Sequence, residues 1–134
     1  MSAGLDTSVV MRLLVGEPKE QAASARKFLN ECHLTGARAQ VSDLVLAETF
    51  FVLQHHYGVP VAAALQQLAA LVADPRINAS ASAMRVLRTP DLPAAKPGFV
   101  DRLIHGCYQA QGDSLITFDK AAARLPNARL LHNL

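Results

Sequence analysis

The sequence predicts an α/β fold, a three-layer α/β/α sandwich built on a short parallel sheet of four or five strands. Three observations support this. Short apolar runs of strand length alternate with longer runs of helical periodicity. Gly and Pro residues mark the boundaries between the runs. A strand followed each time by a helix favours parallel strands with helices on both faces.

Each element has a local reason. Residues 8–15 form an apolar helix with Thr7 or Ser8 as its N-cap, and Ser42 caps a second strong helix that Gly58 closes. Residues 89–98 hold three prolines and are expected to be a loop. The expected strands are residues 2–5, 39–41, 76–79, 114–118 and 128–131. The expected helices are residues 8–15, a segment from Pro18 to Gly36, 43–57, 60–73, 81–88, 99–111 and 120–125.

The bulk properties indicate a single cytoplasmic domain over residues 1–134. The chain is 51% hydrophobic and 18% charged, which is typical of a folded protein with its own core. Its first residues lack the basic start and apolar region of a signal peptide, and no apolar run reaches the length of a membrane span. Cys32 and Cys107 fit no zinc-site spacing and are expected to be reduced thiols.

Two aspartates come directly after predicted strands and before helices. Asp6 follows Leu5, and Asp119 follows Phe118. Ligands of parallel α/β sheets bind outside the carboxyl ends of the strands, so both carboxylates are expected to point into one crevice. The alternative for each is a capping residue of the helix that follows.

Two further acids lie beside apolar residues. Glu48 has Leu44, Val45, Phe51 and Val52 three or four residues away, which places it inside an apolar stripe of its helix. A glutamate is almost never buried unpaired, so Glu48 is expected to meet a cation, which is Arg, Lys or a metal. The alternative is a structural salt bridge or a position at the edge of the core.

Asp101 falls in the first turn of the predicted helix 99–111, where the helix dipole alone favours a carboxylate. Four converging carboxylates repel each other by about 3 kcal/mol per pair at ~5 Å and an effective dielectric of ~20. Mg²⁺ or Mn²⁺ would relieve that repulsion. Setting these four acids aside leaves seven acidic against 13 basic side chains, a balance suited to a polyanionic substrate.

The acids lie in short motifs that resemble the PIN-domain nucleases, and most closely the VapC-type toxins of toxin–antitoxin pairs. The resemblance runs from Leu5 to Leu131 and rests on four pieces in order. They are Leu5-Asp6-Thr7-Ser8-Val9-Val10, Leu46-Ala47-Glu48, Phe99-Val100-Asp101-Arg102-Leu103-Ile104 and Thr117-Phe118-Asp119.

The resemblance implies an Mg²⁺- or Mn²⁺-dependent endoribonuclease that a cognate antitoxin inhibits. The family's metal-binding and catalytic acids carry over onto Asp6, Glu48, Asp101 and Asp119. Ser8 and Thr117 match positions that support these carboxylates by hydrogen bonds. The expected contacts to RNA or antitoxin are Arg12, Arg85, Arg88 and Arg102.

A homodimer is expected because the helices 43–57 and 60–73 are apolar nearly all round, with Phe50, Leu53 and Tyr57 on a face apart from Phe51 and Val52. The alternative is that the second helix covers the first. Two other functions stay open: a catalytically silent PIN-type RNA-binding module, and a phospho-receiver-like signalling domain. A phospho-receiver domain requires an adjacent acidic pair after the first strand and a Lys after the last strand. This sequence has neither feature.

Overall fold

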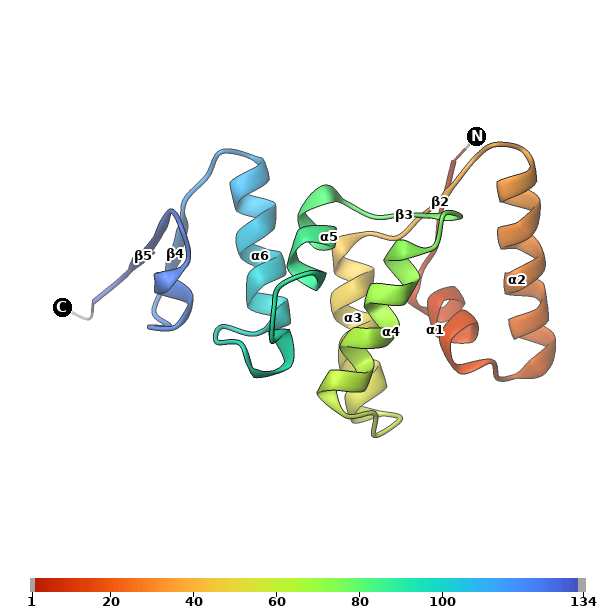
Figure 1. Cartoon of the computed structure of the whole chain (residues 1–134), viewed down its shortest axis with the longest axis horizontal. Helices are drawn as coiled ribbons and strands as arrows, with labels where there is room; N and C mark the ends of the chain where they lie inside the picture. The colour runs from red at the N-terminus through yellow and green to blue at the C-terminus, as the bar shows by residue number, and fades with distance from the viewer. Residues whose placement is uncertain (1, 133–134) are drawn as a thin grey trace. The chain divides into compact units, whose positions relative to one another are not determined.

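The computed structural model describes residues 2–132 and divides into two compact units, Met1–Ser80 (unit 1) and Ala81–Leu134 (unit 2). Unit 1 holds three strands and four helices among these residues (Figure 1). They are β1 (Ala3–Gly4), α1 (Thr7–Val15), α2 (Lys19–Leu34), β2 (Ala39–Gln40), α3 (Asp43–His55), α4 (Val61–Ala73) and β3 (Ile77–Asn78).

The three strands of unit 1 form a parallel sheet in the order β1-β2-β3. Gly4, Gln40 and Asn78 share one row of the sheet. The next residues extend the ladder, since the amide of Leu5 donates to the Gln40 carbonyl oxygen and that of Val41 to the Asn78 carbonyl oxygen, at 2.8 and 2.9 Å. The carboxyl ends of all three strands therefore meet at one edge.

The structure shows which residues cap the N-termini of α1 and α3. The N-cap of α1 is Asp6, which corrects the expectation of Thr7 or Ser8. The backbone of Asp6 is extended, and its carboxylate accepts from the amide of Val9, a position that the helix dipole also favours. Ser42 caps α3 as expected, accepting from the Val45 amide at 3.2 Å.

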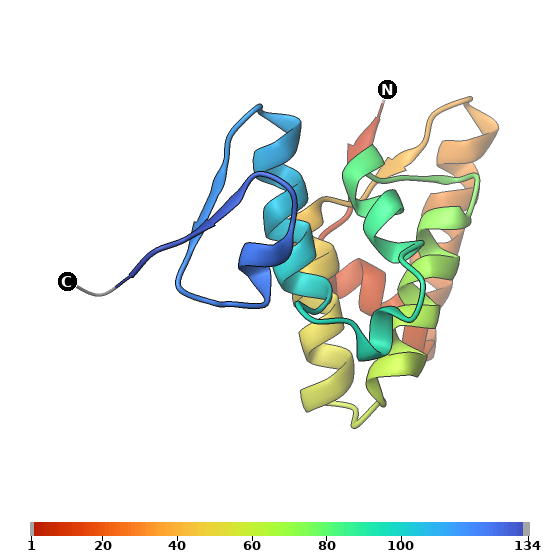
Figure 2. The same ribbon diagram turned by 60° about the vertical axis from the view of Figure 1, so that its left-hand side comes forward.

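The core of unit 1 joins three helices. Met11 of α1, Leu53 of α3 and Ala64 of α4 form a buried cluster, and Phe50 packs against it. Leu53 is only 1% exposed and Phe50 packs against the cluster, so these two positions of the predicted apolar faces are covered. Helices α3 and α4 lie side by side in Figures 1 and 2, and α4 covers this face.

Apolar surface is nevertheless left on another face of α3. Leu44 is 78% exposed and Phe51 is 61% exposed. These two residues flank Glu48 in the stripe that the sequence pattern placed against the core. Leu44, Glu48 and Phe51 are thus exposed, whereas Val52 packs against the core cluster. The buried residues of α3 are Leu46, Thr49 and Leu53.

Among the described residues of unit 2, two α-helices and a 3-10 turn precede the strands, and a second 3-10 turn lies between the two strands (Figure 2). Its elements are α5 (Ala81–Leu87), η1 (Leu92–Ala94), α6 (Phe99–Ala110), β4 (Leu115–Thr117), η2 (Ala122–Arg124) and β5 (Ala128–Leu130). Strands β4 and β5 pair in parallel, with Leu115 opposite Ala128. The expected loop 89–98 contains a 3-10 turn, and the expected helix 120–125 is reduced to one.

Helices α5 and α6 approach each other closely at Gly106. A Cβ atom at this position would collide with the Ser82 hydroxyl, so the contact needs a glycine. Ser82 is buried and its Oγ has no hydrogen-bond partner among the described residues.

The α/β class and the parallel strand direction are confirmed. The five expected strands are present as a three-stranded sheet in unit 1 and a two-stranded sheet in unit 2. None of the helices between residues 2 and 132 combines the length and apolar character needed to cross a membrane.

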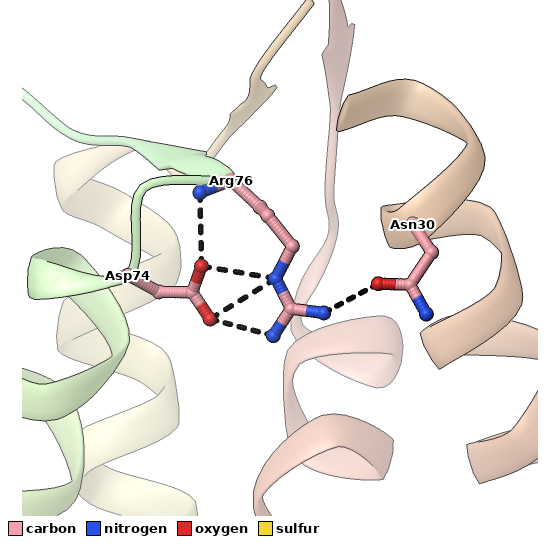
Figure 3. A network of polar contacts seen from close by, with 3 residues as sticks. All are labelled: Asn30, Asp74 and Arg76. Atoms are coloured by element: carbon pink, nitrogen blue, oxygen red, sulfur yellow. Dashed lines mark hydrogen bonds and ion pairs between the residues drawn. The ribbon is translucent and has the colours of Figure 1, made fainter. Parts of the chain in front are cut away.

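An ion pair anchors the start of β3. Asp74 accepts from the backbone amide and Nε of Arg76 through Oδ1, and from Nη2 through Oδ2, at 2.9, 3.0 and 2.6 Å. Arg76 Nη1 donates to Asn30 Oδ1 on α2 at 2.7 Å (Figure 3). The Arg76 side chain lowers the pKa of the Asp74 carboxyl, chiefly through these hydrogen bonds. The network ties the end of α4 to α2.

We predict that Asp74→Asn lowers the free energy of unfolding at pH 7 by about 0.5–1 kcal/mol, the upper range of a solvent-screened pair. Because the folded pKa is depressed, the ionised carboxyl stabilises the fold above its unfolded pKa of about 4, and that contribution is lost as pH falls through the folded pKa. Urea unfolding from pH 7 to pH 2 measures this. The control is Asn30→Ala, which removes an uncharged partner of Arg76. A difference between Asp74→Asn and wild type that stays constant down to pH 2 would contradict the ion-pair explanation.

Candidate acidic site

Asp6 is presented at the carboxyl end of β1 with one oxygen held and one free. Its Oδ1 accepts from the Ser8 hydroxyl at 2.6 Å and from the Val9 amide at 3.1 Å. No described residue bonds to Oδ2. The Ser8 hydroxyl first, and then the Val9 amide, hold the pKa of Asp6 below its usual value. Asp6 is exposed and its ionised form is available for a cation.

Glu48 lies on α3 and is exposed. The expectation that it is buried and needs a cation for that reason is wrong, because its neighbours Leu44 and Phe51 are exposed as well. Within unit 1, no described residue forms a salt bridge to Glu48. Glu48 is a free carboxylate on an apolar surface of unit 1.

The carboxyl edge of the unit 1 sheet carries polar contacts that the sequence pattern did not reveal. The Ser80 hydroxyl donates to Asp43 Oδ1 at 2.7 Å, which links the residues after β3 to the start of α3. Asn78 Nδ2 donates to Gln40 Oε1 at 2.7 Å across β2 and β3. The partners are separated by 37 and 38 positions, so no local sequence pattern signals either contact.

In unit 2, Asp101 is exposed in the first turn of α6, whose N-cap Gly98 gives no side-chain hydrogen bond. Phe99 and Leu103 turn into the core on either side of it. The dipole of α6 favours a carboxylate at this position, which is the alternative explanation that the sequence offered for Asp101. The side chain is open to solvent.

Asp119 follows β4 and is also exposed. Its Oδ1 accepts from the Ala121 amide at 2.9 Å, and its own amide donates to Thr117 Oγ1 at 3.0 Å. Thr117 therefore holds the backbone of Asp119, whereas Ser8 bonds to the carboxylate of Asp6 directly. Both supporting side chains fix the turn that carries the acid.

Each unit thus holds two of the four predicted acids. Within either unit, no three described His, Cys, Asp or Glu side chains converge closely enough to hold a metal ion. The donors themselves are exposed carboxylate oxygens, the ligand type that Mg²⁺ and Mn²⁺ prefer. Asp6 in particular has a free oxygen and a depressed pKa, so its chemistry fits a hard cation.

The predicted arginine contacts lie in different surroundings. Arg12 Nε donates to Gln21 Oε1 at 2.6 Å. Both residues line a mainly apolar cavity of about 610 Å³ between α1 and α2, together with Ser8 and the 43% exposed Phe28. Arg88 is exposed at the end of α5.

Arg85 and Arg102 line a second cavity, which lies inside unit 2. The sequence pattern predicts neither this cavity nor the cavity between α1 and α2, because each is formed by residues of separate helices.

The chain matches the PIN domain over residues 4–128, nearly its whole length and parts of both units. The chain belongs to the PIN-domain family. The fold class and the family expected from the four motifs are therefore confirmed, and the phospho-receiver alternative is set aside.

Among solved structures, this PIN domain is similar to the crystal structure of VapBC2 from Rickettsia felis bound to a DNA fragment from their promoter. The identity is 20%, the match covers 98% of both chains, and the TM-score is 0.40. No curated protein matches the sequence. PIN domains are generally nucleases, so family membership supports the hydrolysis of nucleic acid.

We predict that Ser8→Ala raises the pKa of Asp6 toward its usual value, because it removes the largest cause of the depression. The Val9 amide still donates to the carboxylate, so part of the depression remains. A carboxyl-carbon NMR titration measures the change, with Thr7→Ala as the control. An Asp6 pKa that is the same in Ser8→Ala and wild type would show that the Ser8 hydrogen bond does not act on this carboxyl.

Proposed function

We propose that this PIN domain is a metal-dependent endoribonuclease, with Asp6, Glu48, Asp101 and Asp119 as its metal-binding and catalytic acids. The observation that carries the proposal is Asp6. Its carboxylate stands at the carboxyl end of a parallel strand, oriented by Ser8 and Val9 and open at Oδ2. The other three acids are exposed, and each lies in one of the sequence motifs that resemble those of the family.

Each acid has its own role in the proposed reaction. Asp6 would be the central ligand, and the Ser8 hydroxyl and the Val9 amide lower the pKa of its carboxyl. Glu48 and Asp101 would complete the binding of Mg²⁺ or Mn²⁺ and would orient the attacking water. Asp119 holds a second ion or a water next to it, in a turn that Thr117 fixes. The bound ion supplies positive charge that acidifies water and neutralises the phosphodiester oxygen.

We predict that purified protein cleaves RNA with Mg²⁺ or Mn²⁺ and not in EDTA. Asp6→Asn, Glu48→Gln, Asp101→Asn and Asp119→Asn should each lower the rate by about a hundredfold or more, because losing an outer partner of a metal ligand already costs about 10–100-fold. Cleavage of labelled RNA measures this.

The matched control is Asp91→Asn, at an exposed aspartate whose positive φ asparagine tolerates. Cleavage by Asp6→Asn at the wild-type rate would refute the assignment of Asp6. Binding of RNA without cleavage under any metal condition would identify a catalytically silent module instead.

We further propose that the protein is the toxin of a toxin–antitoxin pair and that a cognate antitoxin inhibits it. The support is the motif resemblance to VapC-type toxins. An antitoxin would bind in the cavity between α1 and α2, where Phe28 offers apolar surface and Arg12 offers a cation for an acidic side chain. Arg88 offers a further cation for RNA or antitoxin.

We predict that expression of the chain alone arrests bacterial growth and that expression of Asp6→Asn does not. Growth curves after induction, with protein levels matched by blotting, measure the difference. Equal growth of the two cultures would contradict the toxin proposal and leave a housekeeping ribonuclease.

We also propose a homodimer, formed through apolar surface that α3 leaves exposed. Leu44 and Phe51 of α3 are large apolar side chains left exposed in unit 1. Exposed apolar patches mark interfaces, and two-fold dimers are the commonest assembly. Light scattering at micromolar concentration decides this, because a mass of 14.4 kDa corresponds to a monomer.

A further inference from the structure

Unit 2 contains a cavity of about 350 Å³ that the four acids do not line. Its walls come from α5, α6 and the segment before β5. The residues that line it are Ser82, Arg85, Val86, Thr89, Arg102, His105, Gly106, Gln109, Leu125 and Pro126. Three of them carry basic side chains, and none is acidic.

The basic side chains are set in place by the helices. Arg102 and His105 are three residues apart on α6 and so share one face. Arg102 Nε donates to the Pro97 carbonyl oxygen at 2.8 Å, and no described residue bonds to the two terminal nitrogens of its guanidinium. Arg85 comes from α5, which packs on α6, and has no partner among the described residues. The cavity thus gathers arginine donors without a counter-charge.

A buried donor in the same cavity is also unmet. Ser82 is 6% exposed, and its hydroxyl forms no hydrogen bond within the described residues. Gly106 opposite it admits this hydroxyl where any Cβ would collide. Buried hydroxyls almost always have a partner, so the exception needs an explanation. Ser82 Oγ has almost no accessible surface, so a ligand acceptor reaches it only when the side chain turns toward the cavity.

The ring of His105 is held in the cavity wall. The Pro126 carbonyl oxygen lies 2.6 Å from His105 Nε2 and 2.6 Å from Gln109 Nε2. These contacts fix the floor of the cavity between α6 and the chain before β5.

We propose that this cavity binds a phosphate group of the RNA backbone. The inference rests on the proposed ribonuclease function and names a substrate-positioning contact apart from the acids. Guanidinium groups suit phosphate geometry, and phosphate oxygens only accept, which matches the terminal nitrogens of Arg102, Arg85 and the Ser82 hydroxyl. An RNA substrate carries a phosphate at every nucleotide, and such contacts fix its register.

The first experiment measures RNA binding in EDTA, so that cleavage does not enter. A fluorescein-labelled single-stranded 12-mer is titrated with wild type, Arg85→Gln, Arg102→Gln and the double variant. The matched control is Arg124→Gln, an exposed arginine of unit 2 outside the cavity. Each cavity variant should weaken binding about three- to tenfold. The log–log slope of affinity against salt concentration should fall by about 0.7 for each phosphate that the variant no longer neutralises.

The second experiment uses inorganic phosphate as the probe. Amide shifts at Ser82, His105 and Gly106 in an NMR titration should saturate, and Ser82→Ala should weaken the response without lowering the melting temperature. Because Arg102 also holds the Pro97 carbonyl, Arg85→Gln serves as the variant that leaves the fold untouched.

Equal weakening of RNA binding in Arg85→Gln and Arg124→Gln would overturn the proposal, as would a flat phosphate titration. Phosphate binding without any effect of Arg85→Gln on RNA binding would overturn the RNA assignment. The ribonuclease proposal fails separately, if RNA binds through the cavity and wild type does not cleave it with Mg²⁺ or Mn²⁺.

Discussion

The start of a helix directly after a parallel strand is the constraint on which the candidate site depends. Such a start leaves backbone amides without partners, and short polar side chains have to satisfy them. Asp6 does so for α1 and Ser42 for α3, while Asp119 and Thr117 close the turn after β4. Polar groups therefore collect at the carboxyl ends of the strands for structural reasons. A nuclease needs carboxylates in the same place, so capping and metal binding are compatible roles for Asp6.

Local patterns were sufficient to predict most of the elements. The capping serine of α3, the proline before α2 and the alternation of short strands with helices all act within a few residues, and the helices and strands lie within about two residues of their expected bounds. Glu48 marks where the pattern fails. Its apolar neighbours at helical spacing indicated burial, but α3 turns Leu46 and Leu53 inward and leaves Leu44 and Phe51 in solvent. When a helix has apolar residues on every side, its sequence pattern does not show which face packs against the core.

The interactions that the sequence did not predict are those between distant positions. The pairs Gln40–Asn78 and Asp43–Ser80 depend on the strand register, and the Asp74–Arg76 pair reaches Asn30 only because α2 passes beside the end of α4. Neither the cavity between α1 and α2 nor the arginine-lined cavity of unit 2 is marked by a local sequence pattern. Motif order predicted the family correctly and led to the proposal of its four acids, whereas the surfaces proposed to bind the rest of a substrate or partner depend on packing.

The close approach of Ser82 to Gly106 couples two positions that lie 24 residues apart. A side chain at position 106 requires the removal of the hydroxyl at position 82, so the two sites are expected to change together among relatives of this chain. The glycine also lets α5 and α6 approach at this point more closely than a larger residue at position 106 would allow. The separation of the arginines across the cavity is then inherited from a pair of residues that carry no charge at all.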